Sequence, residues 1–208
     1  MLFGYTGNTA VGDPLRESII EVLNGFDTFQ SRWKVAARLC PAVKRVLDPA
    51  YENFTPSGAS WAQILQELGG SLLVLGRDDG GHWLLDINHH ATATPHWERG
   101  FHTVGSGSQG AEVVTGLYEH HDFPRLDLWR LKLLAYRSVA TCIKVLGPSG
   151  VGGRVGLWSS ADGGGFAQSS ESELDGLRRN VEEWERNENE AFGAMTSEEA
   201  EPLPAPVD

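Results

Sequence analysis

A glycine-rich turn at residues 105–110 restricts the fold more than any other feature of this sequence. It reads Gly-Ser-Gly-Ser-Gln-Gly, follows a predicted strand over residues 102–104 and opens a predicted helix that runs to residue 120. The spacing matches G-x-G-x-x-G, and the N-terminus of such a helix can bind an anion. A dinucleotide-binding unit also needs a second parallel strand roughly 20 residues further on. Because residues 126–146 are predicted to be helical, the turn indicates a helix packed closely on a sheet, and a nucleotide- or anion-binding module stays open as an alternative.

Hydrophobic periodicity predicts an α+β fold, in which strands are joined by hairpins and helices follow one another in pairs. Strands are predicted over residues 2–6, 71–76, 82–87 and 155–158, and the turn at 78–81 joins the middle two as a hairpin. Helices are predicted over residues 13–23, 33–46, 60–68, 126–146 and 173–190. Asp13 is expected to cap the first helix, Pro41 to kink or break the second, and Ser170 or Ser172 to cap the last.

The net charge of −11 is concentrated at the C-terminal end of the chain. Residues 169–208 hold twelve acidic and three basic residues, a balance of −9, which leaves −2 for the first 168 residues. The sequence contains no basic patch of the kind that would indicate nucleic-acid binding. We expect a folded body over residues 1–168, a charged helix over 169–192 and a disordered, acidic and proline-rich tail over 193–208.

The apolar segments and the cysteines indicate a soluble protein of a reducing compartment. No run approaches the ~18 consecutive apolar residues that a membrane span needs, and the N-terminus does not resemble a signal peptide. Cys40 and Cys142 both fall in apolar predicted helices, which is typical of buried, inert thiols. We therefore predict a cytoplasmic location.

Neither the histidines nor the serines form a recognisable catalytic or metal-binding motif. The histidines are His82, His89, His90, His96, His102, His120 and His121. The first five lie on a predicted hairpin and its loop without regular spacing to a carboxylate, so no metal site and no cofactor are predicted. Ser106 or Ser108 with His102 and Asp122 could form a triad, but the G-x-S-x-G turn that exposes such a serine is absent.

Three segments, taken in order, resemble the proteasome-type subunits of the N-terminal-nucleophile hydrolases, including bacterial proteasome-like and HslV-like β subunits. Residues 3–10 read Phe-Gly-Tyr-Thr-Gly-Asn-Thr-Ala, similar to a family strand followed by A-G-x-x-A-D. Residues 103–108 are similar to its A-x-G-S-G-S turn, and residues 148–153 to its S-G-G loop. The predicted hairpin at 71–87 lies where the family has a strand pair, so the resemblance covers residues 2–158.

The resemblance implies a four-layer α-β-β-α sandwich that lacks its first strands. In the family the nucleophile is an N-terminal threonine with its own α-amino group as base, tuned by an early aspartate and lysine. None of these three has a counterpart here, so the resemblance implies an N-terminally truncated or non-catalytic subunit.

Individual positions carry over from the family. Gly7 matches the oxyanion-hole glycine, and Ser106 matches the serine that supports the nucleophile's amino group. Tyr5 and Thr9 match residues that line the substrate side-chain pocket. Pro148 and Val151 stand where the family often has an aspartate and a serine, and neither side chain can hydrogen bond.

The leading functional prediction is therefore a subunit of a proteasome-like, threonine-type peptidase, incomplete or non-catalytic as written. Its implied partners are further subunits of a homo-oligomeric or mixed ring, a peptide or protein substrate and an ATPase. Two alternatives stay open: the nucleotide- or anion-binding module at residues 105–110, and a non-catalytic interaction protein that uses its Glu-rich helix and acidic tail.

Overall fold

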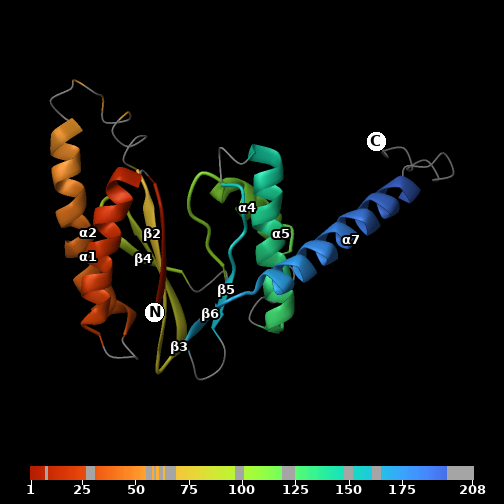
Figure 1. Ribbon diagram of the computed structural model, residues 1–208, viewed down its shortest axis with the longest axis horizontal. Helices are drawn as coiled ribbons and strands as arrows, with labels where there is room; N and C mark the ends of the chain where they lie inside the picture. Colours follow the sequence, from red (N-terminus) through yellow and green to blue (C-terminus); the bar gives the residue numbers. More distant parts are fainter. Residues whose placement is uncertain are drawn as a thin grey trace, which may run out of the picture.

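The computed structural model describes residues 1–7, 9–26, 31–54, 58, 60, 63, 69–96, 101–118, 125–147, 152–160 and 165–195. Within them, helices lie on both sides of a four-stranded sheet, and a two-stranded sheet lies beside it (Figure 1). The elements are β1 (Leu2–Thr6), α1 (Thr9–Asn24), α2 (Arg32–Phe54), β2 (Ser71–Asp78), β3 (Gly81–Asn88), β4 (Ala93–Pro95), α4 (Ser108–Gly116), α5 (Leu128–Leu146), β5 (Trp158–Ser160), β6 (Phe166–Gln168) and α7 (Glu171–Met195). The larger sheet has the order β1-β2-β3-β4 and is antiparallel throughout. The predicted mixture of helices and hairpin-joined strands is confirmed.

One face of the larger sheet and helices α1 and α2 enclose the main hydrophobic core. Side chains alternate between the two faces of a strand, and the register sets Tyr5 opposite Leu72 and Leu72 opposite Ile87. The largest fully buried side chains of this core are Leu15, Ile19, Val35, Leu39, Val43, Leu72, Val74, Leu85 and Ile87. The other face of β2 and β3 is only half-buried, so burial is strongly one-sided.

In the hairpin of β2 and β3, a glycine lies opposite a tryptophan and leaves space for the tryptophan ring. Gly76 pairs with Trp83 across the two strands, and the indole of Trp83 is buried in the core. A Cβ atom at position 76 would collide with this indole ring. Gly76 therefore gives Trp83 the space it occupies, and the predicted hairpin is confirmed with slightly longer strands.

Helices α4 and α5 pack against each other on the other side of the larger sheet (Figure 1). A Cβ atom at Gly110 would lie 3.1 Å from the Sγ atom of Cys142, so the last glycine of the glycine-rich turn permits this close approach. The buried hydroxyls of Thr115 and Ser138 lie 3.1 Å apart across the same interface. Asp127 caps α5 by accepting a hydrogen bond from the backbone N–H of Arg130 at 2.8 Å.

Two helix predictions are wrong in their boundaries. Helix α1 begins at Thr9, so Asp13 lies inside it and does not cap it. Pro41 was expected to kink or break the second helix, but helix α2 continues through Pro41 and Pro49 to Phe54, so it does not break there. An internal proline costs roughly 3 kcal/mol, but Leu39, Val43 and Leu47 are buried on both sides of Pro41. Each such side chain contributes about 1.5–3 kcal/mol on burial, which is enough to hold the helix together.

The strand predictions at two further places are also wrong. Residues 102–104 form no strand, and the second neighbour of β3 is the unpredicted β4. The strand expected at 155–158 begins instead at Trp158 and pairs with β6. In the helix predicted at 60–68, Ser60 and Gln63 form a reciprocal capping box. The backbone N–H of Ser60 donates to Gln63 Oε1 at 2.8 Å, and the backbone N–H of Gln63 donates to Ser60 Oγ at 3.3 Å. The other residues predicted for this helix lie outside the described part.

Helix α7 extends away from the rest of the molecule (Figure 1) and is attached to α5 by contacts that run from Glu173 to Glu188. Ser170 caps it, since its Oγ atom accepts a hydrogen bond from the N–H of Glu173 at 3.2 Å, as predicted. Leu177 and Val181 are its buried residues. The helix runs to Met195, three residues into the predicted tail, and residues 196–208 lie outside the described part.

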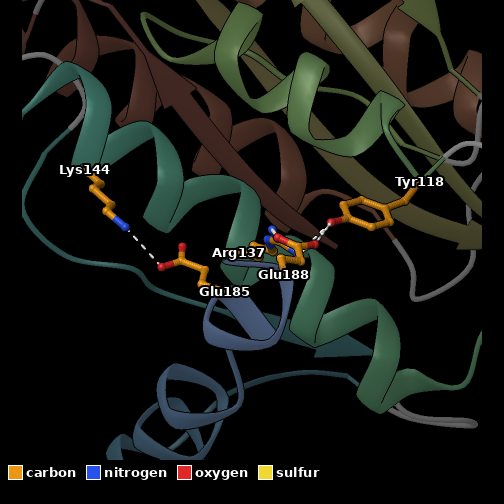
Figure 2. Close-up of polar contacts among 5 residues, drawn as sticks. All are labelled: Tyr118, Arg137, Lys144, Glu185 and Glu188. Carbon is orange, nitrogen blue, oxygen red and sulfur yellow. Dashed lines mark hydrogen bonds and ion pairs between the residues drawn. The ribbon is translucent and has the colours of Figure 1, made fainter. Parts of the chain in front are cut away.

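A polar cluster around Arg137 holds α7 against α4 and α5 (Figure 2). The guanidinium of Arg137 donates hydrogen bonds to Tyr118 Oη at 2.6 Å and to Glu188 Oε1 at 3.1 Å and Oε2 at 2.5 Å. It also lies 4.1 Å from the ring centroid of Trp184, at cation–π distance. The Arg137 side chain is 12 % exposed, so this bidentate pair is better shielded than an ordinary surface ion pair.

The Arg137–Glu188 pair makes the attachment of α7 sensitive to acid. The hydrogen bond from Arg137 lowers the pKa of Glu188, so this carboxylate stabilises the fold above its unfolded pKa of about 4.3 and ceases to do so as the pH falls through its lower folded value. Glu188→Gln is expected to cost about 1 kcal/mol at pH 7, because Glu188 itself is partly exposed. The difference from wild type, measured by thermal unfolding between pH 7 and 3, should shrink steadily as the pH falls below about 4.3.

Glu185→Gln is the matched control for this experiment. Glu185 lies on the same helix and pairs with Lys144 at 3.1 Å, but Lys144 is 70 % exposed. The control should therefore change stability by less than about 0.5 kcal/mol at any pH. Equal effects of the two substitutions would contradict the special role of the Arg137 pair.

Candidate functional site

A pocket of about 890 Å³ lies between the second face of the larger sheet and helices α4 and α5. The end of β1 contributes Thr6 and Gly7, and the start of β2 contributes Gly70 and Ser71. The loop at 102–107 and the first residues of α4 form another wall, and Val139 and Cys142 of α5 close the far side. Four segments far apart in the sequence thus meet around one cavity.

Small residues allow these segments to approach one another. Gly7 has a φ of +141°, which L side chains rarely adopt. A Cβ atom there would contact the Tyr5 hydroxyl and lie 2.9 Å from the Gly69 carbonyl oxygen. Gly105 has a φ of +98°, and a Cβ atom there would lie 3.2 Å from the side chain of Thr6. A Cβ atom at Gly70 would collide with the Thr6 carbonyl oxygen, so the shape of the pocket depends on glycine at three positions.

The pocket brings together the two residues predicted for catalytic support. Gly7 and Ser106 both line it, from the end of β1 and from the turn before α4. No sequence spacing required this, since 99 residues separate the two positions. Their roles as oxyanion donor and support for a nucleophile stay predictions.

The two residues predicted to bind substrate lie elsewhere or cannot be placed. Tyr5 packs against the main core, beneath Gly7 and Gly12, and is not among the residues that line the pocket. Its hydroxyl is buried without a hydrogen-bond partner, and burial raises its pKa. Thr9 opens α1, but its side chain lies outside the described part, as do Pro148, Val151 and Asp122.

The glycine-rich turn is explained by packing and not by a dinucleotide-binding unit. The N–H of Ser108 donates to the carbonyl of Gly105 at 3.0 Å, and the N–H of Ala111 donates to Gly107 at 2.9 Å. Gly107 precedes the helix and also accepts a bond from the Cys142 thiol at 3.4 Å. Because all described pairs of the larger sheet are antiparallel, the turn does not join two parallel strands as a βαβ unit requires.

The thiol in the pocket wall is a poor nucleophile. Cys142 is buried, and burial raises the pKa of its thiol. The thiolate is the reactive form, so a raised pKa keeps this group protonated near neutral pH. This agrees with the inert role expected for it.

A cluster of Asp86, His96 and His102, which the sequence did not predict, lies at the side of the pocket. His102 lines the pocket, and its Nε2 atom lies 3.3 Å from the Oδ2 atom of Asp86. The ring of His96 stacks on that of His102, with centroids 3.6 Å apart. Burial lowers the pKa of His96, and the neighbouring His102 lowers it further. The signal for the cluster was the carboxylate of Asp86 on a strand whose alternate residues, Leu85 and Ile87, are apolar and buried.

Comparison of the sequence with models of protein families gave no match, and comparison with curated proteins gave none. The structure is similar to Anbu, described as an ancestral β-subunit, from Yersinia bercovieri, with a TM-score of 0.65 and 14 % identity. It is equally similar, at 13 % identity, to a mutant of Anbu from Hyphomicrobium sp. strain MC1. The chain has a proteasome-like fold. Both matches cover 99 % of this chain and 80 % of the Anbu chain.

The proteasome-like fold confirms the coarse prediction made from the three sequence segments. At this level of identity the likeness concerns the fold, and the chemistry must be argued from the pocket itself. None of the described helices is both long and apolar enough to cross a membrane.

Proposed function

We propose that this chain is a subunit of a proteasome-like peptidase ring assembled from several copies. The observation that carries the proposal is the meeting of Gly7 and Ser106 in one pocket, on a fold similar to Anbu. The two residues come from the two motifs that most resemble the family. A peptide or protein substrate, an ATPase partner and a cytoplasmic location belong to the same proposal.

Under this proposal, two groups in the pocket would assist acyl transfer to a nucleophile. A backbone N–H at Gly7 would stabilise the oxyanion of a tetrahedral intermediate, and one such donor contributes about 2.7–4 kcal/mol in other hydrolases. The Ser106 hydroxyl, at the pocket rim, would hold the amino group of a threonine nucleophile. We further propose the four-layer sandwich of the family, with β5 and β6 as part of its second sheet, and the boundaries at residues 168 and 192.

The genomic sequence before Met1 gives the first test of peptidase activity. An in-frame extension with a threonine that processing exposes, followed by an aspartate and a lysine, is expected if the subunit is catalytic. The extended protein should then cleave fluorogenic peptides, and threonine to alanine should abolish cleavage. An in-frame stop codon would contradict the peptidase and leave the non-catalytic ring subunit.

Native mass spectrometry of the purified chain tests the assembly separately. A defined oligomer of several copies is expected. A monomer at micromolar concentration and above would contradict the ring, whatever the peptidase assay gives.

A non-catalytic interaction protein is the second candidate, and one observation favours it. The C-terminal end of α7 extends from the body (Figure 1), and Phe192 and Met195 near it are 67 % and 75 % exposed. A chain that ends at Asn189 keeps the buried residues Leu177 and Val181 and should stay folded. Under this candidate it should no longer recruit the partner that the full chain binds in a pull-down.

A further inference from the structure

Three side chains beside the pocket converge in a manner suited to a cation, and we propose that Asp86, His96 and His102 bind a divalent transition-metal ion, with Zn²⁺ as the representative. Asp86 lies on β3, His96 directly follows β4, and His102 precedes the glycine-rich turn. One ligand atom from each lies within 4.8 Å of the others. This inference is independent of the proposed peptidase subunit.

The spacing of Asp86 and His102 already suits a tetrahedral site. Zn²⁺ binds histidine nitrogen and carboxylate oxygen at about 2.0–2.2 Å, which puts neighbouring ligand atoms about 3.3–3.6 Å apart in a tetrahedron. The Nε2 atom of His102 lies 3.3 Å from the Oδ2 atom of Asp86. These side chains are 18 % and 17 % exposed, so water competes little for the position between them.

His96 supplies the third ligand after a small movement. Its ring is stacked on His102 with an angle of 12° between the planes, so the nitrogen lone pairs of the two rings lie in nearly parallel planes. A common ion needs them to converge, and tilting one imidazole out of the stack achieves this. Binding is therefore expected to separate the two rings.

Two orphaned atoms in the cluster point to a missing partner. The Oδ1 atom of Asp86 and the Nε2 atom of His96 are buried and have no hydrogen-bond partner. A buried polar atom left in this state destabilises the fold. A bound cation would engage both side chains at once. Within the described part of the chain, no second group of three His, Cys, Asp or Glu residues meets the same distance criterion.

The proposed site opens toward the pocket. Three protein ligands leave a fourth position for water or another ligand. Because His102 is one of the residues that line the pocket, that position is expected to face molecules bound there. The donor set of two imidazoles and one carboxylate favours Zn²⁺, Co²⁺ or Fe²⁺ over Mg²⁺ and Ca²⁺, which prefer oxygen ligands.

Titration of the full chain with metal ions tests the proposal. After treatment with EDTA and dialysis, calorimetry should show one equivalent of Zn²⁺ bound, and excess Mg²⁺ should not compete. Co²⁺ should give the visible absorption of a four-coordinate site. In NMR spectra, Zn²⁺ should shift the ring protons of His96 and His102 as their stack opens.

Variants distinguish this site from adventitious binding. His102→Gln and Asp86→Asn should each weaken Zn²⁺ binding at least about tenfold, since even loss of an outer-shell partner costs 10–100-fold. His90→Gln is the control, because His90 is exposed in the turn that follows β3 and does not belong to the cluster. If Asp86→Asn does not fold, as judged by circular dichroism, His96→Gln replaces it. The proposal would be overturned if Zn²⁺ did not bind at one equivalent, or if His102→Gln and His96→Gln left its binding unchanged. The Asp86–His102 hydrogen bond would then only hold the loop against the sheet.

Discussion

Leu85→Ala is expected to lower the free energy of unfolding by about 3–5 kcal/mol, the range found when a large buried side chain is truncated in a core that cannot collapse. Leu85 is fully buried and lies on β3, between β2 and β4. Its side chain points into the layer between the sheet and helices α1 and α2, where close packing leaves little freedom to refill the space. Urea denaturation followed by circular dichroism measures the loss.

Leu84→Ala is the matched control, because it removes the same atoms from the neighbouring residue. Leu84 lies on the opposite face of β3 and is only half-buried, so its truncation should cost less than half as much as that of Leu85. The contrast tests whether burial is one-sided. Equal losses for the two variants would contradict the core described above.

The main core could be predicted from the sequence because it depends on local periodicity. The apolar runs of β2 and β3 and the apolar stripes of α1 and α2 indicate elements that bury a face, and the resemblance to proteasome-type subunits agreed with them. The ends of the helices were harder to predict from the sequence. Pro41 favours a break by its local chemistry, and only the tertiary burial of Leu39 and Val43 against the sheet overrides it.

The candidate site was predictable only in part, because it is assembled from distant segments. Gly7 and Ser106 could be found through motif resemblance, since their backbone conformations are local properties of two turns. The cluster of Asp86, His96 and His102 has no regular spacing. It forms because β4 pairs with β3, and His102, on the segment before the glycine-rich turn, lies 3.3 Å from Asp86.

Gly7→Ala is expected to destabilise the protein by about 2–6 kcal/mol. The positive φ costs about 1–3 kcal/mol, and the steric overlap costs a similar amount. The overlap is specific, since the new methyl group would press on the Tyr5 ring and on the Gly69 carbonyl. Gly4→Ala, on the strand β1 that ends just before Gly7, is the control. Its Cβ would have no atom within 4 Å, so it should change stability by less than about 1 kcal/mol.

A double-mutant cycle with Tyr5→Phe identifies the source of the Gly7→Ala effect. The Tyr5 hydroxyl has no hydrogen-bond partner, so Tyr5→Phe alone should be nearly neutral. Combined with Gly7→Ala it should restore about 0.5–2 kcal/mol, as expected for residues in direct contact, while the strain at φ +141° remains. Additive losses would show that Tyr5 does not press on position 7. Full recovery would show that the backbone can adopt this conformation with alanine, and the requirement for glycine at the mouth of the pocket would then be steric alone.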